Sequence, residues 1–430
     1  MKLEMQTYKV TDARFGPKTC LCGDQLEIAA EALKAALLED PIFEDAWIEL
    51  VKPGENTRII HVADVLEPRL KLTGGTAYAG TAAPVAKLGW GITRAMEGVT
   101  VMTSCQFPLR RHGGLNVVRD AALDMSGPAS GLTPFSEKIN IVCCLKLKPD
   151  LDEDQYEESV RLAGAKAARF VGETMRDAEP NETRTFTLDG AKPGLPNVAL
   201  LYQVHAVGLN LNSFFYGMPF SNLLPILVHP NEILDGALVD GNWSHPAVKT
   251  PTWYHTNSRL VHELYDRHGK TLNFVGFVLY RGRFEEMQGK VRCANQVVNT
   301  AQMLHADGAV VSWEGAGNAF IETMLVVKGC EQAGIKAALL TFEHGGLNGV
   351  DEPLFYSEAE ADAIVSSGTY EREIVLPPVS RVVGGELFVI NPEEGGIPLD
   401  ARGTIELHDR LQLYCAANEY GFTKNSCADF

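Results

Sequence analysis

The spacing of apolar residues changes character about halfway along the chain. In the first half, short apolar runs predict strands at about residues 47–51, 57–61, 69–72, 100–104 and 139–147. Leu26, Leu33 and Leu37 recur at helical spacing, which predicts a helix over about residues 25–39. Acidic residues open a second periodic stretch, which predicts a longer helix over about residues 151–174. A mixed α+β arrangement is therefore expected for this half.

The second half alternates apolar strands with helical stretches. A strand is predicted at residues 197–206, and the run at residues 272–280 is apolar enough for a strand buried on both faces. Further segments then continue the alternation: helices at about 284–306 and 318–334, and strands at 308–313 and 335–342. This order predicts a parallel sheet with right-handed crossovers. A helix at 358–367 and a short strand at 373–376 are expected to extend it.

The fold class is therefore predicted as α/β, with a mixed α+β N-terminal part followed by a doubly wound parallel-sheet domain. Residues 178–196 contain three prolines and many polar side chains, which is typical of a linker or an exposed excursion. The predicted units are an N-terminal domain over residues 1–177, the linker over 178–196, and the parallel-sheet domain over 197–430.

The charge balance excludes several kinds of partner. The chain of 430 residues carries 38 Lys and Arg against 55 Asp and Glu, a net charge of −17. Without a basic excess to neutralise phosphates, neither a nucleic acid nor an anionic membrane is expected to bind. Nine cysteines are too few for a disulfide scaffold, most lie in apolar runs typical of buried thiols, and no stretch reaches 18 apolar residues. A reduced cytoplasmic protein is expected.

Candidate chemistry follows from the ends of the predicted parallel strands, where open α/β sheets bind their ligands. Glu314 follows the strand that ends at Trp313, and Glu343 and His344 follow the next strand. Arg281 adds positive charge at the same edge. The pattern leaves open whether the two carboxylates act in catalysis or cap helices.

The histidines do not have the spacing of a metal site. His255 and His262 are seven residues apart, and His268 follows six residues later. No other ligand type stands nearby at a suitable interval, so these histidines are predicted to be solvated or capping. No metal is predicted.

Several long and unusual strings carry a family resemblance. The main ones are LDGALVDGNWS at residues 234–244, KTPT at 249–252, LEPR at 66–69, DMSGP at 124–128 and NEYGF at 418–422. End to end, the chain resembles the α/β subunit precursor of component B of the glycine/sarcosine/betaine reductases, a family related to the D-proline reductase proprotein.

The resemblance implies a mechanism that one residue of this chain contradicts. In that family the precursor cuts itself before a cysteine that follows Gly-Asn, and the new N-terminal residue becomes a pyruvoyl group that forms a Schiff base with the substrate amine. Here Trp243 stands at that position. An indole has no hydroxyl or thiol to attack the preceding carbonyl. We therefore predict an uncut chain without pyruvoyl or another cofactor, although cleavage before Ser244 remains an alternative.

The same segment is a candidate substrate site. We expect Asn242, Trp243 and Ser244 to contact the substrate, together with Trp313, Asn318 and Arg281. Trp243, with nearby Trp253 and Tyr254 and with Trp313, could cage a quaternary ammonium by cation–π attraction, worth about 0.5–2 kcal/mol for each ring. A betaine has no N–H and needs no Schiff base. The alternative for Trp243 is ordinary packing in the core.

Three functions remain open. The first is an uncleaved component-B-like subunit, oligomeric, that binds a small amine or betaine-like substrate for a partner subunit bearing a cysteine or selenocysteine; this subunit would belong to an oxidoreductase that cleaves a C–N or similar carbon–heteroatom bond. The second is a non-catalytic binding or scaffold subunit. The third is a stand-alone enzyme that uses Glu314, Glu343 and His344 as acid and base groups.

Overall fold

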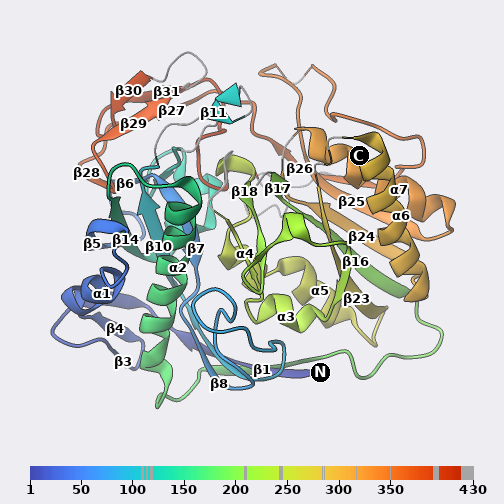
Figure 1. Cartoon of the computed structure of the whole chain (residues 1–430), viewed down its shortest axis with the longest axis horizontal. Coiled ribbons are helices and arrows are strands. Elements are labelled where there is room, and N and C mark those ends of the chain that lie inside the picture. Colours follow the sequence, from blue (N-terminus) through green and yellow to red (C-terminus); the bar gives the residue numbers. More distant parts are fainter. Residues whose placement is uncertain are drawn as a thin grey trace.

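The computed structural model describes residues 1–107, 111–112, 115–116, 120–207, 211–241, 246–282, 284, 286–315, 317–348, 350–390 and 397–417. Two β-rich halves lie side by side (Figure 1). The N-terminal strands and the long helix α2 form one half, and a parallel sheet flanked by α6 and α7 forms the other.

The N-terminal half contains two four-stranded sheets. One sheet has the order β5 (Phe43–Val51), β14 (Ile139–Leu147), β10 (Val99–Cys105) and β7 (Val62–Leu66). The other has the order β15 (Glu182–Thr187), β1 (Lys2–Lys9), β9 (Gly91–Glu97) and β8 (Arg69–Thr73). Helix α2 (Glu153–Gly172) begins at the N-cap Asp152 and packs on β10 and β7, where a Cβ on Gly164 would come within 2.9 Å of Leu66 Cδ1. A glycine at this position lets the helix approach the sheet closely.

All five strands predicted in this half are confirmed, including β6 (Thr57–Ile60), and so is the long helix. The helix predicted over residues 25–39 is wrong in its first part, because α1 covers only Ala30–Leu37. The preceding residues form β4 (Gln25–Ile28), which lies between β2 (Asp12–Phe15) and β3 (Cys20–Cys22). Leu26 and Ile28 are both buried, so a two-residue alternation ran into the helical pattern.

The second half is built on a six-stranded sheet. Its order is β21 (Ile226–Val228), β23 (Asn273–Arg281), β16 (Asn197–Val204), β24 (Gly308–Trp313), β25 (Lys336–Glu343) and β26 (Ile364–Thr369). Every neighbouring pair is parallel except β21 with β23. Helices α6 (Met287–Met303) and α7 (Phe320–Gln332) share one apolar core with one face of this sheet. The short helices α3 (Pro230–Leu234), α4 (Thr252–Thr256) and α5 (Arg259–Arg267) share another core with its second face (Figure 1). The predicted α/β class is confirmed.

Two predicted extensions of this sheet are wrong. Residues 358–363 are not helical, and the next segment is strand β26, the edge partner of β25. Its β-branched residues Ile364, Val365 and Thr369 favour the ladder along that edge over the short helical periodicity. Strand β27 (Ile374–Leu376) does exist, but it pairs with β31 (Ile405–Leu407) in a separate sheet.

The C-terminal strands return to the N-terminal half (Figure 1). Strand β28 (Arg381–Val383) lies parallel to β6, and β6 also pairs with β13 (Ala122–Asp124). Beyond it, β29 (Leu387–Ile390) and β30 (Ile397–Asp400) form a hairpin. Segment 178–196 contributes β15 to the sheet of β1. The smaller pairings are β11 (Arg111–His112) with β12 (Leu115–Asn116), β17 (Ala206–Val207) with β18 (Leu211–Asn212), and β19 (Phe214–Phe215) with β20 (Met218–Pro219) and β22 (Leu238–Val239).

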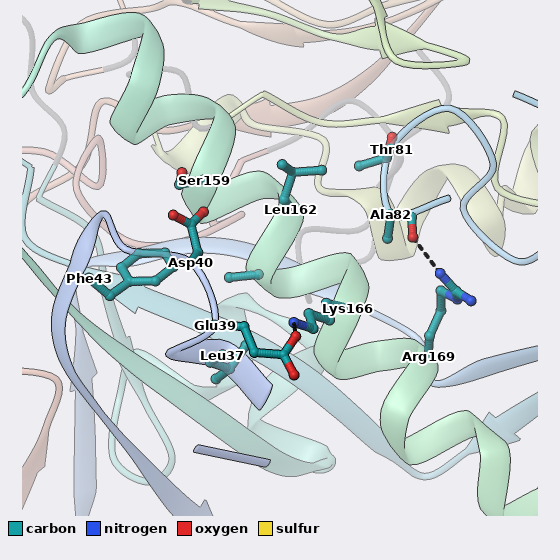
Figure 2. Close-up of a pocket in the computed structure, with 11 residues that line it drawn as sticks. Leu37, Glu39, Asp40, Phe43, Thr81, Ala82, Ser159, Leu162, Lys166 and Arg169 are labelled. Atoms are coloured by element: carbon teal, nitrogen blue, oxygen red, sulfur yellow. Dashed lines mark hydrogen bonds and ion pairs between the residues drawn. The ribbon is translucent and has the colours of Figure 1, made fainter. Parts of the chain in front are cut away.

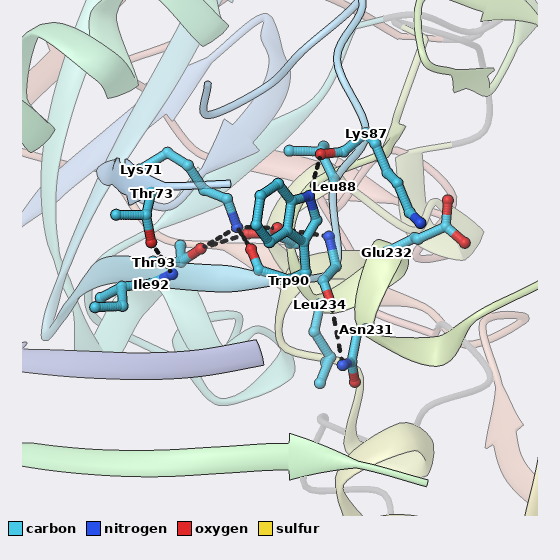
Figure 3. A network of polar contacts seen from close by, with 12 residues as sticks. Lys71, Thr73, Lys87, Leu88, Trp90, Ile92, Thr93, Asn231, Glu232 and Leu234 are labelled. Carbon is cyan, nitrogen blue, oxygen red and sulfur yellow. Dashed lines mark hydrogen bonds and ion pairs between the residues drawn. The ribbon is translucent and has the colours of Figure 1, made fainter. Parts of the chain in front are cut away.

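A buried polar network joins the two halves at Asp235, the residue that follows α3. Lys71 forms an ion pair with its carboxylate, the Thr93 hydroxyl donates to it at 2.5 Å, and the Gly89 amide donates at 2.7 Å. Figure 3 shows Lys71, Thr93 and Trp90 close together, and Lys71 also donates to the Trp90 carbonyl at 2.6 Å. The network therefore fixes the string that begins at Leu234 against β8 and β9.

No helix in the described part of the chain combines the length and the apolar character needed to cross a membrane. The cysteines at positions 105, 143, 144, 293, 330 and 415 are all buried, as predicted.

Candidate functional site

Glu314 is the centre of a buried polar cluster at the carboxyl ends of β16 and β24. It immediately follows β24, and its side chain is fully buried. Its backbone amide donates to the Gln203 carbonyl at 2.9 Å, which turns the residue toward β16. Its Oε1 accepts a hydrogen bond from the His205 amide at 2.7 Å and another from the Ser213 hydroxyl. The end of β16 and the following hairpin thus hold one oxygen of this carboxyl group in place.

The second oxygen of Glu314 faces a histidine on α4. His255 Nε2 lies 3.7 Å from Glu314 Oε2, and neither atom has a hydrogen-bond partner among the described residues. Burial raises the pKa of Glu314 to about 8, and the nearby Asp240 carboxylate adds to the rise. Burial also lowers the pKa of His255 to about 3. At neutral pH this pair is therefore a protonated carboxylic acid beside a neutral imidazole.

Asp64 of β7 adds a second carboxyl group with a raised pKa. Thr252 holds it from the start of α4, with its amide 3.0 Å from Oδ1 and its hydroxyl 2.6 Å from Oδ2. Burial, followed by the charge of Asp240, raises the pKa of Asp64 to about 7. The hydroxyl of Thr252 also accepts from the Asp240 amide at 2.9 Å, so Thr252 links the two aspartates.

Lys249 supplies the compensating positive charge. Its Nζ lies 2.7 Å from Asp240 Oδ2 and donates to the Ala63 carbonyl. The Asp240 charge raises the pKa of both Asp64 and Glu314, while Lys249 lowers both. The pKa values of Asp64 and Glu314 therefore both depend on the same two neighbours, Asp240 and Lys249. Buried carboxyl groups with pKa values near neutrality are typical of acid–base sites, although buried structural networks also produce them.

The buried cluster, defined as Asp64, Asp240, Lys249, His255 and Glu314, adjoins the segment that carries the family resemblance. Asp240 and Gly241 lie directly before Asn242, Trp243 and Ser244, which fall outside the described residues. A Cβ on Gly241 would lie 1.8 Å from the Asn212 carbonyl oxygen, so this position accepts only glycine. The backbone at Gly241 is therefore packed closely against β18.

The other predicted binding residues lie elsewhere. Trp313 is buried in the core, where its indole donates to Thr341 Oγ1 at 2.9 Å and its ring stacks on Phe342 at 5.0 Å between centroids. Asn318 is exposed in the turn before α7. Arg281 donates to the Ser221 carbonyl at 2.8 Å and lies over the Phe284 ring. Glu314 is thus the one predicted residue, among those described, that belongs to the buried cluster.

His344 belongs to a second polar group at the end of β25, whereas Glu343 is the half-buried last residue of that strand. His344 Nδ1 lies 3.7 Å from Glu371 Oε1 and 3.3 Å from the Tyr370 hydroxyl. Glu371 in turn accepts from the amides of Gly345 and Gly346, each at 2.7 Å. Burial lowers the pKa of His344, and the charge of Glu371 opposes this fall.

Trp253 of α4 points away from the buried cluster. Trp253 and His255 are two residues apart, so they occupy opposite sides of this helix. Trp253 lines a separate cavity of about 360 Å³, and the ammonium group of Lys138 lies 4.8 Å from its ring centroid. Trp253 and Trp313 belong to different apolar clusters. The described aromatics of the predicted cage are therefore not gathered around one point.

Sequence reasoning missed most of the buried cluster. His255 was predicted to be solvated or capping, which is wrong because its side chain is 1% exposed. The capping prediction is confirmed for His268, which is the C-cap residue of α5 and whose amide donates to the Leu264 and Tyr265 carbonyls. Lys249 and Thr252 lie in a string that carries the resemblance, and Asp64 interrupts an apolar run. These were the available signals for a buried polar site.

Together the fold and the site define an α/β protein with a buried acid–base cluster at the carboxyl edge of a parallel sheet. Residues 1–428 match the sequence model of the family described as "Glycine/sarcosine/betaine reductase component B subunits". The chain belongs to this family, and the predicted resemblance is confirmed. It is therefore a member of a family of oxidoreductase subunits.

Three curated relatives align with this chain over most of its length and most of their own. "Glycine reductase complex component B subunits alpha and beta" from Acetoanaerobium sticklandii is 32% identical over 434 residues, covering 99% of each chain. "Betaine reductase complex component B subunit alpha" from Peptoclostridium acidaminophilum is 32% identical and covers 100% of each. "Sarcosine reductase complex component B subunit alpha" from the same organism is 33% identical over 89% of each. No solved structure matches the chain.

Proposed function

We propose that this chain is an uncleaved, non-pyruvoyl subunit of a reductase complex. It holds a small glycine- or betaine-like substrate while a partner subunit bearing a thiol or selenol reductively cleaves the C–N bond, or a similar carbon–heteroatom bond. One observation carries the proposal: a chain that matches the family over residues 1–428 has Trp243 directly after Gly241-Asn242. The names of the relatives, all components of reductase complexes, support a multi-subunit setting.

The residues present do not fit a pyruvoyl group at this position. Self-cleavage needs a hydroxyl or thiol that attacks the preceding carbonyl, and the indole of Trp243 has neither. The proposed reaction is therefore a direct displacement on a substrate with a good leaving group. A thiolate or selenolate of the partner forms the new bond to the substrate carbon, and the C–N bond breaks with its electron pair on nitrogen. A quaternary ammonium leaves as a neutral tertiary amine, so no proton is required.

The buried cluster supports a cationic substrate. The cluster has three carboxyl groups but only one ammonium group, that of Lys249. Burial and the charge of Asp240 raise the pKa values of Asp64 and Glu314. A quaternary ammonium that docks beside Asp240 would favour ionisation of Asp64 and Glu314, because opposite charges attract strongly in a low-dielectric interior. The same cluster supports the alternative of a stand-alone acid–base enzyme, because protonated Glu314 can donate a proton.

Intact-mass measurement tests the uncut chain. A single species near 46.9 kDa is expected, whereas two fragments that divide near residue 243 would contradict the proposal. Purification of the affinity-tagged chain from its native cells under reducing conditions tests whether a partner subunit binds to it. Co-purification of a subunit with an active cysteine or selenocysteine, and release of amine from betaine only when both are present, are expected. Turnover by the chain alone would support the stand-alone enzyme, and ligand binding without turnover in either case would support the scaffold subunit.

A further inference from the structure

A second cavity lies in the N-terminal half, apart from the buried cluster. Its volume is about 480 Å³, and it is bounded by α2, by the end of α1 and the start of β5, and by residues 81–82 (Figure 2). No residue of the buried cluster lines it. The cavity is therefore independent of the site proposed for the reductase function.

One face of α2 forms the long wall of this cavity. Ser159, Leu162, Ala163, Lys166 and Arg169 line it at successive intervals of three, one, three and three residues, so they share one side of the helix. The separation of Ser159 from Arg169 corresponds to about 15 Å along the helix axis. The cavity is therefore elongated along α2.

A cationic group with spare hydrogen-bond capacity stands at one end. Among the described residues, the half-buried guanidinium of Arg169 has one hydrogen-bond partner, the Ala82 carbonyl. Thr81 lines the same end, and its buried Oγ1 has no partner among the described residues. A guanidinium has five N–H donors in a planar fork that suits a carboxylate. This end is therefore built for a carboxylate.

An anionic group stands toward the other end. Asp40 Oδ1 accepts from the Ile42 amide at 3.0 Å, and the carboxylate has no ion-pair partner among the described residues. Figure 2 shows Asp40 and Arg169 well separated, with Leu162 and the pair Lys166–Glu39 between them. Lys166 is satisfied by Glu39 and by the Ala36 carbonyl at 2.6 Å. One cation and one anion are thus left for a ligand.

We propose that this cavity binds an elongated small-molecule zwitterion. The ligand carboxylate is held by Arg169 and the Thr81 hydroxyl, and its ammonium group by Asp40. Its methylene chain lies against Leu162, Ala163 and the ring of Phe43, which all line the cavity. Each charged end then gains a charge-assisted hydrogen bond, and the apolar middle is removed from water.

Isothermal titration calorimetry of the full chain tests the proposal with ω-amino acids of increasing length, from γ-aminobutyrate to ε-aminocaproate and longer homologues. One length is expected to bind best at millimolar concentration. Hexanoate and hexylamine, which each lack one charge, are expected to bind at least about tenfold more weakly, the loss of one charge-assisted hydrogen bond. Equal binding of hexanoate, or no binding by any homologue, would overturn the proposal.

Variants locate the site. Arg169→Gln and Asp40→Asn are each expected to weaken binding by about tenfold. The carboxamide oxygen that Asp40→Asn introduces can still accept from the Ile42 amide, so this variant keeps the turn. Arg176→Gln changes an exposed arginine paired with Glu173, outside the cavity, and is expected to bind normally. Unchanged far-ultraviolet circular dichroism confirms folding. Normal ligand affinity in folded Arg169→Gln would contradict the assignment, while the intact mass and partner binding of the chain report on the reductase function separately.

Discussion

Glu314 and His255 face each other across 3.7 Å in a fully buried position, and both are neutral near pH 7. The separation is too long for a hydrogen bond, so the acid proton of Glu314 is not committed to the imidazole. The pair is thus an uncharged boundary of a cluster that otherwise contains ionised groups.

The raised pKa of Glu314 predicts how stability changes with pH. The folded pKa of about 8 lies above the value of about 4.3 expected in an unfolded chain. Between these values the folded state holds the proton more tightly, so the free energy of unfolding falls as pH rises, by at most about 1.4 kcal/mol per pH unit for this group. Glu314→Gln is expected to remove the contribution of this group to the slope, leaving that of Asp64, and to be the more stable protein at pH 8. Urea unfolding between pH 5 and pH 8 measures the free energy of unfolding of both proteins.

The matched control for that prediction is Glu343→Gln, which changes a half-buried carboxylate at the end of the next strand. This variant is expected to keep the wild-type pH slope. An identical slope in wild type and Glu314→Gln would mean that Glu314 is ionised in the folded state.

Trp243 is predicted to contribute to the binding of a quaternary ammonium. Trp243→Leu keeps an apolar side chain but removes the aromatic face, so betaine affinity is expected to fall by about 0.5–2 kcal/mol, or roughly twofold to thirtyfold. Trp243→Phe is expected to lose less, because a ring remains. Calorimetric titration with betaine and tetramethylammonium measures both effects. Equal affinity in wild type and Trp243→Leu would assign this indole to core packing instead.

The strands and the parallel sheet were predictable because local patterns dominate them. Strand β14 was predicted over the same residues that form it, since its run of apolar residues is long and is buried along most of its length. Strand β26 was missed because residues 358–367 carry a short helical periodicity. The end of this segment forms a strand because it pairs with the edge of β25. Such pairing is non-local and leaves no mark in the sequence.

The buried cluster was predictable only in part. Position at a strand end singled out Glu314, and this rule also selected Trp313, whose side chain points into the core. Thr252 and Asp64 are 188 residues apart in the sequence and meet only because α4 docks on β7, so no spacing rule could join them. His255 lies on a helix of only five residues, too short for a periodic pattern to indicate which of its faces is buried.

We predict that the charge of Lys249 offsets much of the free-energy cost of burying the aspartates of the cluster. Lys249→Met keeps the apolar stem and removes the charge, which leaves the Asp240 carboxylate buried without its cation. Breaking a buried ion pair in this way costs about 3–5 kcal/mol. The double variant Lys249→Met with Asp240→Asn removes both charges and is expected to recover much of that loss. Urea unfolding of the two single variants and the double variant measures the coupling.

An additive double variant would contradict this prediction, because independent sites show no coupling energy. The pair of Lys336 and Glu331 provides a control, since the lysine side chain is 80% exposed. Lys336→Met is expected to change stability by less than about 1 kcal/mol.

Arg58 is predicted to hold the C-terminal strands on the N-terminal half. Its fully buried guanidinium makes two contacts with Asp124, at 2.7 and 2.9 Å, and donates to the carbonyls of Pro377, Ala401 and Gly403. Arg58→Ala leaves Asp124 and these three carbonyls without this donor, and the loss of such a buried pair costs about 3–5 kcal/mol. Limited proteolysis is expected to cut the variant faster between residues 377 and 403.

The control is Arg381→Ala, which breaks contacts of a half-exposed arginine with Glu49 and Glu55. This variant is expected to cost under about 1 kcal/mol of stability. If Arg58→Ala and Arg381→Ala were cut equally slowly, β28 and the apolar contacts around it would be sufficient to anchor the C-terminal strands.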